Sequence, residues 1–283
     1  MPVLLPPALE LSLDLLRCPT CRTFRLHPDR GALRCPAGHT FDIARQGYAG
    51  LLTGTRATSG DDAAMVHARA RFLTTGAYGP IRKVVARLAA DSVPEQATVL
   101  DVGCGTGYYL AGVLDQLPDA RGLGLDTSVR ALRSAARAHD RAAAVAWDVF
   151  RPFPLASGVA DVVLDVFAPR NPVEFHRVLR PTGRLIVVRP TGRHLAELRG
   201  RFPGTVTIDP AKEQRLHRAL DPFFEAAVTE EMEYPATLAR WEALDLVAMT
   251  PSARHVSRAD LANDGPLPDQ VTVSVLATAY QPR

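Results

Sequence analysis

The sequence predicts an α/β protein with a mostly parallel sheet, preceded by a small metal-binding module. The sheet prediction starts at residues 99–102, a short apolar run that leads through a glycine-rich turn into a helical pattern over 108–117. Two further apolar runs, 121–126 and 145–148, each end in an acidic residue. Cys18, Cys21, Cys35 and His39 lie close together near the N-terminus. A strand, a glycine turn and a helix start present free backbone N–H groups, which can hold a nucleotide-like ligand.

The composition is that of an ordinary globular protein. The 283 residues are 47% hydrophobic and 22% charged, which allows a large core in one domain or in two unequal ones. No apolar run approaches the ~20 residues that a membrane span needs. Residues 1–16 are apolar but lack the basic leading region and the cleavage site of a signal peptide. We therefore expect a cytoplasmic protein that does not enter a membrane.

The charge balance leaves the choice of partner open. The formal net charge is only +3, yet 31 of the 33 basic residues are arginine. Codon bias in a GC-rich genome explains such a preference without any function. The functional explanation is phosphate recognition, because a planar guanidinium binds a phosphate through two parallel hydrogen bonds.

The N-terminal module has the ligand spacing of a zinc site. Cys18 and Cys21 form a C-x₂-C knuckle, and Cys35 and His39 follow 13 intervening residues later. Three thiolates and one imidazole fill a tetrahedral Zn²⁺, so the site is structural and folds a module too small to hold itself together. A redox pair or a disulfide at the knuckle is the weaker alternative. Cys104, remote in sequence, is expected to be only a small residue in the glycine loop.

Arginines dominate the charge of this module. Between residues 17 and 45 there are six of them against two acids, Asp29 and Asp42. Three thiolates on one Zn²⁺ leave the metal centre at about −1, so the arginines must provide any attraction for nucleic acid. The RNA-binding candidates are Arg22, Arg25, Arg34 and Arg45. The alternative is a solvated surface that binds no ligand.

The turn after the first strand places an acid before alternating glycines: Asp101-x-Gly103-x-Gly105-Thr106-Gly107. In the dinucleotide fingerprint the third glycine comes one residue later, where this chain has Tyr108. The pattern instead resembles motif I of class I S-adenosylmethionine-dependent methyltransferases, in which the glycines let the backbone lie against the methionine half of the cofactor. The alternative is an ordinary doubly wound domain that transfers no methyl group.

The acids at the next two strand ends fit the same cofactor. Asp126 lies 19 residues beyond Gly107, where an acid can accept hydrogen bonds from both ribose hydroxyls. Asp148, at the end of the third run, is expected to meet the adenine amino group. We therefore predict a class I Rossmann-like methyltransferase fold with a small N-terminal zinc-ribbon module.

Periodic patterns supply the remaining elements of such a fold. Strands are expected at 160–167, 183–188, 223–232 and 271–280, and helices at 65–73, 81–90 and 241–248. Residues 178–183 resemble the L-[KR]-P-G-G turn that precedes the fifth strand in these enzymes. The last strand is expected to lie antiparallel between the fifth and the sixth. Residues 53–63, rich in Gly, Thr, Ser and Asp, are typical of a mobile linker.

A more specific resemblance lies in four stretches, 35–52, 65–80, 193–198 and 249–251. They resemble, in this order, the large-subunit rRNA (guanine-N1)-methyltransferases of the RlmA type, which include enzymes conferring resistance to tylosin-like macrolides. The resemblance implies S-adenosylmethionine as cofactor and, as substrate, a guanine in a 23S rRNA hairpin lining the peptide exit tunnel. It also implies cofactor contacts by the matching residues Tyr78, Gly105, Thr106 and His194.

These assignments divide the chain into three parts. Residues 1–52 are expected to form a zinc-binding RNA-recognition module, 53–80 a linker with a helix that covers the cofactor, and 81–283 the methyltransferase domain. The sequence leaves the oligomeric state open, a homodimer included.

Two residues after the fourth strand are candidates for the chemistry on guanine. N1 of neutral guanine carries a proton, for which the Asp165 carboxylate is the candidate acceptor, and Phe167 is the candidate to stack on a flipped base. A structural acid and a core aromatic are the alternatives. Two other functions stay open: a small-molecule methyltransferase of secondary metabolism, and a zinc-stabilised RNA-binding protein with a vestigial cofactor site.

Overall fold

The computed structural model describes most of the chain. The described residues are 5–52, 54, 60–91, 93–202, 218–250 and 266–283. Most of the expected linker and Pro251 of the last family-like stretch therefore lie outside them.

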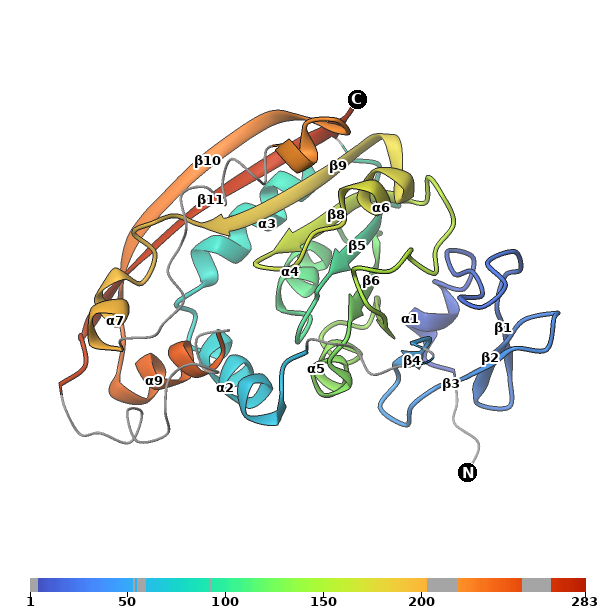
Figure 1. The fold of residues 1–283 in the computed structure, drawn as a ribbon, viewed down its shortest axis with the longest axis horizontal. Helices are drawn as coiled ribbons and strands as arrows, with labels where there is room; N and C mark the ends of the chain where they lie inside the picture. The colour runs from blue at the N-terminus through green and yellow to red at the C-terminus, as the bar shows by residue number, and fades with distance from the viewer. Residues whose placement is uncertain (1–4, 53, 55–59, 92, 203–217, 251–265) are drawn as a thin grey trace.

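The main sheet extends from the long C-terminal strands to the N-terminal module (Figure 1). Its strands are Ala49–Gly50 (β4), Thr98–Val102 (β5), Arg121–Asp126 (β6), Ala142–Ala146 (β7), Ala160–Val166 (β8), Leu179–Pro190 (β9), Phe224–Thr237 (β10) and Gln270–Pro282 (β11). Their order is β10-β11-β9-β8-β5-β6-β7-β4. The strands from β4 to β9 are parallel, and β11 runs antiparallel between β9 and β10. The expected inserted last strand is thus confirmed.

Helices cover both faces of this sheet. They are Pro7–Glu10 (α1), Ala63–Thr74 (α2), Gly79–Ala90 (α3), Tyr108–Gln116 (α4), Val129–Ala135 (α5), Pro172–Val178 (α6), Ala196–Arg201 (α7) and Arg240–Ala248 (α9). Successive side chains of a strand point to opposite faces. Val99 accordingly packs in the core beneath α3 and α4, whereas its neighbour Leu100 packs in the core shared with α1 and α6.

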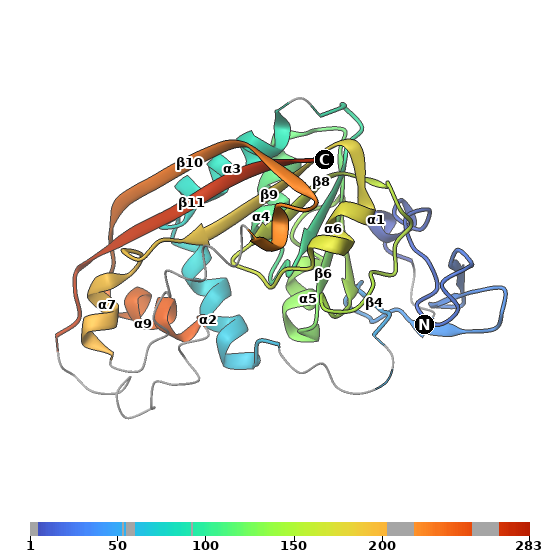
Figure 2. The ribbon, with the colours of Figure 1, turned by 45° about the horizontal axis from the view of Figure 1, so that its top comes forward.

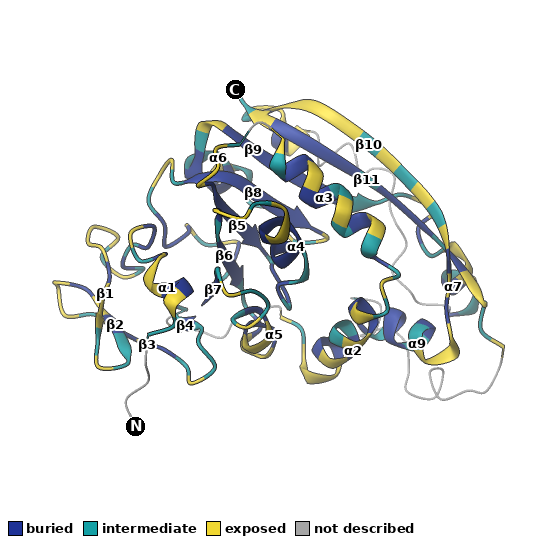
Figure 3. Ribbon diagram, turned by 180° about the vertical axis from the view of Figure 1, so that it is seen from behind, coloured by how far each residue is buried: buried dark blue, intermediate teal, exposed yellow. Residues whose placement is uncertain are grey.

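Burial differs sharply between the centre and one edge of the sheet (Figure 3). β5, β7 and β8 are buried over their full length, as is usual for parallel strands covered on both faces. β10, at the edge, is exposed at most of its positions. Below the long strands, α2 and α9 lie side by side at one end of the molecule, where Arg71 of α2 forms an ion pair with Asp245 of α9 (Figure 2).

The N-terminal module is a three-stranded antiparallel sheet of His27–Asp29 (β1), Ala32–Arg34 (β2) and Thr40–Asp42 (β3). The chain leaving this small sheet joins the main one, because Ala49 and Gly50 of β4 pair with Val145 and Ala146 of β7. Leu33 and Phe41 of the module are part of the same apolar core as α1 and α6.

Three expected boundaries differ clearly from the structure. The strand expected at 223–232 continues to Thr237 as β10. The third strand ends at Ala146, so Asp148 lies two residues beyond it in a loop. Of the turn expected at 178–183, Val178 ends α6 and the other residues are counted into β9. Leu179 pairs with Ala160, whereas Arg184 pairs with Val162. The intervening residues therefore bulge out of the ladder, which keeps part of their turn character. No helix in the described ranges is long and apolar enough to cross a membrane.

Candidate functional site

The glycine loop between β5 and α4 is packed so closely that side chains do not fit. Gly103 and Gly107 have φ values of +75° and +82°, in the left-handed region that favours glycine. A Cβ atom on Gly103 would lie 2.6 Å from Cβ of Ala168, and one on Gly107 would lie 2.8 Å from Cβ of Ala138. The loop is thus held between α5 and the segment after β8, and its backbone faces the carboxyl end of the sheet.

Asp126, at the end of β6, reaches back to this loop. Its Oδ2 accepts a hydrogen bond from the N–H of Gly105 at 2.8 Å, and its Oδ1 accepts one from the N–H of Ser128 at 2.7 Å. Burial raises the pKa of Asp126, and both of these hydrogen bonds oppose the rise. Asp126, which is expected to bind the ribose, is therefore hydrogen-bonded to Gly105, which is expected to contact the methionine half of the cofactor.

Three carboxylates gather at the carboxyl ends of β5, β6 and β8. Burial raises the pKa of Asp101 to about 8, and the nearby Asp126 and Asp165 add to the rise. Oδ2 of Asp101 is buried and has no hydrogen-bond partner among the described residues. Buried carboxyl groups that lack hydrogen-bond partners and counter-ions are unfavourable, and a cationic ligand would stabilise their charged form. S-adenosylmethionine carries a sulfonium and an ammonium group, so the residues fit it.

Asp165 is more enclosed than the sequence suggests. Its side chain is completely buried, and Nε of Arg170 lies 3.3 Å from Oδ2 without forming a hydrogen bond of good geometry. Burial raises the pKa of Asp165 to about 7, and Arg170 opposes the rise. A carboxyl group with such a pKa can exchange protons near neutral pH.

The structure brings together Tyr78, His194 and Phe167, which are far apart in sequence. Tyr78, just before α3, is buried, and its hydroxyl contacts Nε2 of His194 from the loop after β9. The ring of Phe167 stacks on that of His194 with centroids 6.0 Å apart and an interplanar angle of 26°. Phe167 has a φ of +56° and remains 39% exposed, so its ring is available to a planar ligand.

The contacts of Asp148 and Thr106 give less support to their expected roles in binding the cofactor. Asp148 accepts a hydrogen bond from the N–H of Phe150 at 3.0 Å and thus faces its own turn. Thr106 is half-buried in the glycine loop. Cys104 is buried there, and its Sγ fills the space where a Cβ on Gly124 would lie. Cys104 is therefore a packing residue, as expected.

The four expected metal ligands come together in the N-terminal module. The ligand atoms of Cys18, Cys21, Cys35 and His39 all lie within 4.8 Å of one another. Nδ1 of His39 lies 3.5 Å from Sγ of Cys18 and 3.2 Å from Sγ of Cys35. A tetrahedral zinc centre places sulfur and nitrogen ligands about 3.5 Å apart, so the cluster has the size of a zinc site. Four protein ligands leave no open position, and the site is structural.

The four candidate RNA-binding arginines are all exposed. Arg34 also forms an ion pair with Asp29 at 3.1 Å, so its guanidinium has a partner inside the N-terminal module. Phe24 is 42% exposed directly after the zinc knuckle, between Arg22 and Arg25. An exposed aromatic ring between arginines is typical of a surface on which nucleic acid bases stack. The sequence signal for this surface is Phe24 between two arginines.

Two further residues at the cofactor loop escaped the sequence analysis. Tyr109 has a buried hydroxyl that finds no hydrogen-bond partner within the described ranges. Arg69 of α2 reaches the loop from outside, with Nη1 3.4 Å from the position of a Cβ on Gly105. The Gly-Tyr-Tyr continuation of the motif was a signal for Tyr109, whereas no local signal pointed to Arg69.

Comparison with protein families defines the class. Residues 16–56 match the RlmA N-terminal zinc-ribbon family, and residues 99–183 match a methyltransferase domain family. The fold, the glycine loop and the cysteine cluster agree with both matches. The protein is therefore an S-adenosylmethionine-dependent methyltransferase with an N-terminal zinc ribbon.

Comparison with whole proteins defines the family. The chain is 46% identical to a provisionally named 23S rRNA (guanine-N1)-methyltransferase of Micromonospora griseorubida, over 94% of this chain and 97% of that protein. It is 43% identical to the 23S rRNA (guanine(748)-N1)-methyltransferase of Streptomyces fradiae, over 94% and 96%. The chain belongs to the family of 23S rRNA (guanine-N1)-methyltransferases. Among solved structures, a TehB-like methyltransferase of Corynebacterium glutamicum is similar to 78% of this chain and all of that one, with 16% identity and a TM-score of 0.49.

Proposed function

We propose that this protein methylates N1 of one guanine in a hairpin of 23S rRNA that lines the peptide exit tunnel, and thereby confers resistance to macrolides. The observation that carries the proposal is the length of the similarity. Identity of 43–46% extends over 94% of the chain and so includes the zinc ribbon as well as the cofactor fold. A methyltransferase of small molecules has no use for an arginine-rich ribbon.

In this proposal the glycine loop and the acids at the strand ends hold the cofactor. Bound S-adenosylmethionine supplies the electrophilic methyl group. Asp126 would bind the ribose, Asp148 the adenine, and Gly103, Gly105, Thr106 and Gly107 the methionine half. Asp101 would face the positive charge, and Tyr78 and His194 would close the site on the side of Phe167.

The guanine would stack on Phe167, which lies next to the Tyr78–His194 pair. A base in a hairpin must leave its stack to be modified, and an exposed ring at the cofactor site gives it a new stacking partner. Asp165, two residues earlier, would take the N1 proton. Both of its oxygens are buried, so contact between the base and Asp165 would require the residues that cover this carboxyl group to move.

Primer extension on 23S rRNA tests the proposal directly. N1 methylation blocks base pairing, so reverse transcriptase should stop at one guanine in cells that carry the gene and not in cells without it. Cells carrying the Gly105→Val variant are the matched control, because a side chain there at φ +52° strains the cofactor loop. The same cells should tolerate more of a tylosin-like macrolide than the controls.

Absence of any stop would contradict the proposal. In that case, activity on small molecules after deletion of the ribbon would identify a methyltransferase of secondary metabolism. Failure of the full-length protein to bind S-adenosylmethionine in calorimetry would instead point to an RNA-binding protein with a vestigial cofactor site.

A further inference from the structure

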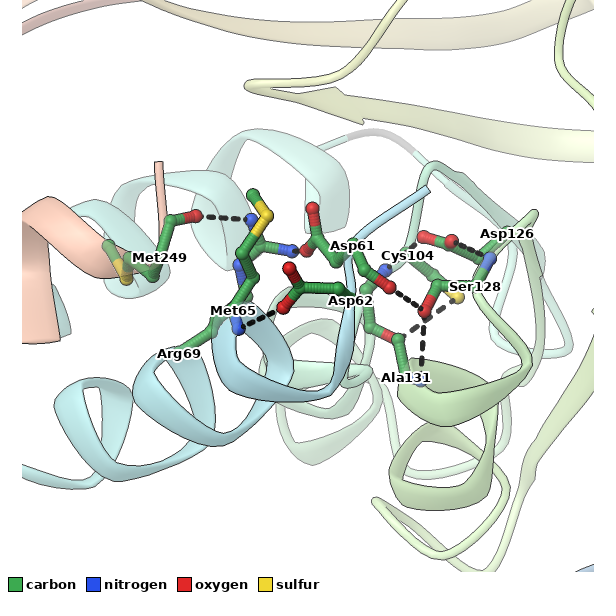
Figure 4. A network of polar contacts seen from close by, with 10 residues as sticks. Asp61, Asp62, Met65, Arg69, Cys104, Asp126, Ser128, Ala131 and Met249 are labelled. Atoms are coloured by element: carbon green, nitrogen blue, oxygen red, sulfur yellow. Dashed lines mark hydrogen bonds and ion pairs between the residues drawn. The ribbon is translucent and has the colours of Figure 1, made fainter. Parts of the chain in front are cut away.

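Residues 60–62, which precede α2, lie beside the turn that follows Asp126 (Figure 4). We call them the strap. The carbonyl oxygen of Asp61 accepts a hydrogen bond from the Ser128 hydroxyl at 2.8 Å. A Cβ on Gly60 would lie 3.1 Å from Oγ1 of Thr127. The strap is therefore in contact with the turn that follows Asp126.

Arg69 holds the strap from one side. Its guanidinium forms an ion pair with the Asp61 carboxylate and donates a hydrogen bond from Nη2 to the carbonyl oxygen of Met249 at 2.7 Å (Figure 4). The same guanidinium lies against Gly105. One side chain thus connects the strap, the glycine loop and the end of α9, which is 180 residues away in sequence.

The contacts continue to the Asp126 carboxylate. Ser128, which donates its hydroxyl to the strap, donates its N–H to Oδ1 of Asp126, and Gly105 donates its N–H to Oδ2. Asp126 is therefore fixed by two neighbours, each of which touches the strap or Arg69. A shift of the strap would move the carboxylate.

Arg69 also adds a positive charge near Asp126. The charged and titratable groups facing Asp126 are Asp61 from the strap, Arg69 from α2, Asp101 from β5 and Cys104 from the loop. Burial raises the pKa of Asp126, and the hydrogen bonds from Ser128 and Gly105 oppose the rise. Asp61 and Arg69 make smaller contributions, Asp61 raising the pKa and Arg69 lowering it. Among these four groups, Arg69 is the cation that favours the ionised carboxylate.

We propose that Arg69 is a positioning residue for the cofactor: it ties the strap to the glycine loop and holds the Asp126 carboxylate where the ribose binds. This inference rests on the proposed cofactor site. It predicts an effect on cofactor affinity that depends on pH, because a protonated Asp126 loses one acceptor for the ribose hydroxyls.

A purely structural role of Arg69 is the alternative, since Arg69 also connects α2 to α9. Arg71 provides the matched control for that role. It lies on the same helix and makes two hydrogen bonds to Asp245 of α9, at 2.7 and 2.8 Å, and it packs over the ring of Trp241. No contact of Arg71 reaches the glycine loop within the described residues. Arg71→Gln therefore loosens α2 from α9 without touching Asp126.

The test is calorimetry of S-adenosylhomocysteine binding to the full-length, zinc-loaded protein from pH 8 down to pH 5, because the pKa of Asp126 is raised from its ordinary value of 3.8. Arg69→Gln should weaken binding about tenfold at neutral pH, the effect of one lost charge-assisted contact. The loss should grow as the pH falls, because Asp126 then protonates more readily. Arg71→Gln should lower the melting temperature and leave both the affinity and its pH profile unchanged.

Asp61→Asn is the second variant, should Arg69→Gln fail to fold. It releases the strap but removes a negative charge from the surroundings of Asp126, so binding should weaken without the added sensitivity to low pH. Equal effects of Arg69→Gln and Arg71→Gln, or a loss of affinity independent of pH in Arg69→Gln, would overturn the inference. A wild-type protein that binds S-adenosylhomocysteine but leaves 23S rRNA unmodified would overturn the proposed function and leave Arg69 in its role.

Discussion

The hydroxyl oxygen of Tyr78 lies 3.1 Å from Nε2 of His194, whose other ring nitrogen, Nδ1, accepts a hydrogen bond from the N–H of Ser274 at 3.2 Å. A nitrogen that accepts carries no proton, so the proton of the neutral ring lies on Nε2 and is donated to Tyr78. The Tyr78 hydroxyl then keeps its own proton free for another acceptor. The pair thus turns a buried phenol into an oriented donor beside Phe167.

Replacing Tyr78 with phenylalanine should weaken S-adenosylhomocysteine binding and cost about 1–3 kcal/mol of stability, because the Nε2 proton of His194 is left unpaired. Calorimetry and thermal unfolding measure the two effects. Tyr234→Phe is the matched control: its hydroxyl donates to the carbonyl oxygen of Ala77, next to Tyr78. That variant should lose stability only, and equal losses of affinity in both would refute a special role of Tyr78.

His194 should make the fold less stable in mild acid. Burial, aided by Arg199, lowers the pKa of His194 to about 4, below the ordinary value of 6.5. Between these values the unfolded chain binds a proton that the folded protein does not, so stability falls as the pH drops from 6.5 to 4, by at most about 3 kcal/mol. Unfolding curves of His194→Gln should lack this contribution. An identical slope in the variant would assign it to other groups.

The zinc site should be required for the ribbon and for rRNA modification. We expect one zinc per chain in protein purified without chelators, and its loss in Cys18→Ser because a tetrahedral site needs all four ligands. Metal analysis and primer extension provide the readouts. Cys104→Ser changes a cysteine outside the cluster and should keep the zinc. Zinc-free wild-type protein with full activity would contradict the assignment.

Asp165→Asn should slow methyl transfer by about a hundredfold or more if Asp165 is the general base. With its pKa raised to about 7, the wild-type residue gains its acceptor form as the pH rises, so turnover should increase through pH 7. The variant should be partly rescued at higher pH, where solvent takes the N1 proton. RNA affinity should stay near normal. Normal turnover in the variant would place the base elsewhere.

Arg22 and Arg25 should position the RNA without taking part in the chemistry. Replacing both with alanine should weaken RNA binding and reduce its salt dependence by about 0.7–0.9 in log–log slope per lost phosphate contact. Turnover at saturating RNA should change little. The control is the double alanine variant of Arg130 and Arg133, exposed on α5, with the same change in charge. If the salt dependence of RNA binding has the same slope in both double variants, Arg22 and Arg25 are solvated surface residues that do not contact RNA phosphates.

The sequence predicted those parts of the site that depend on residues close together in the chain. β6 has its predicted bounds, Arg121–Asp126, because its apolar run ends abruptly at an acid. The four metal ligands also came from spacing alone, since a zinc knuckle is set by a tight turn. Contacts made by the tertiary fold left no such pattern. Arg69 meets Met249 across 180 residues, and the complete burial of Asp165 depends on strands and loops on every side of it.

The pairing of β4 with β7 limits how the ribbon can be exchanged between related enzymes. Gly50, only eleven residues beyond His39, already belongs to the sheet of the catalytic fold, and Leu33 of the ribbon shares its core with Leu155 and Phe175. A chimera that exchanges ribbons between relatives would therefore have to carry over α1 and β4 and match the facing side chains of the recipient. The ribbon and the catalytic fold therefore share one packed interface, and a change of side chains on one side of it requires matching changes on the other.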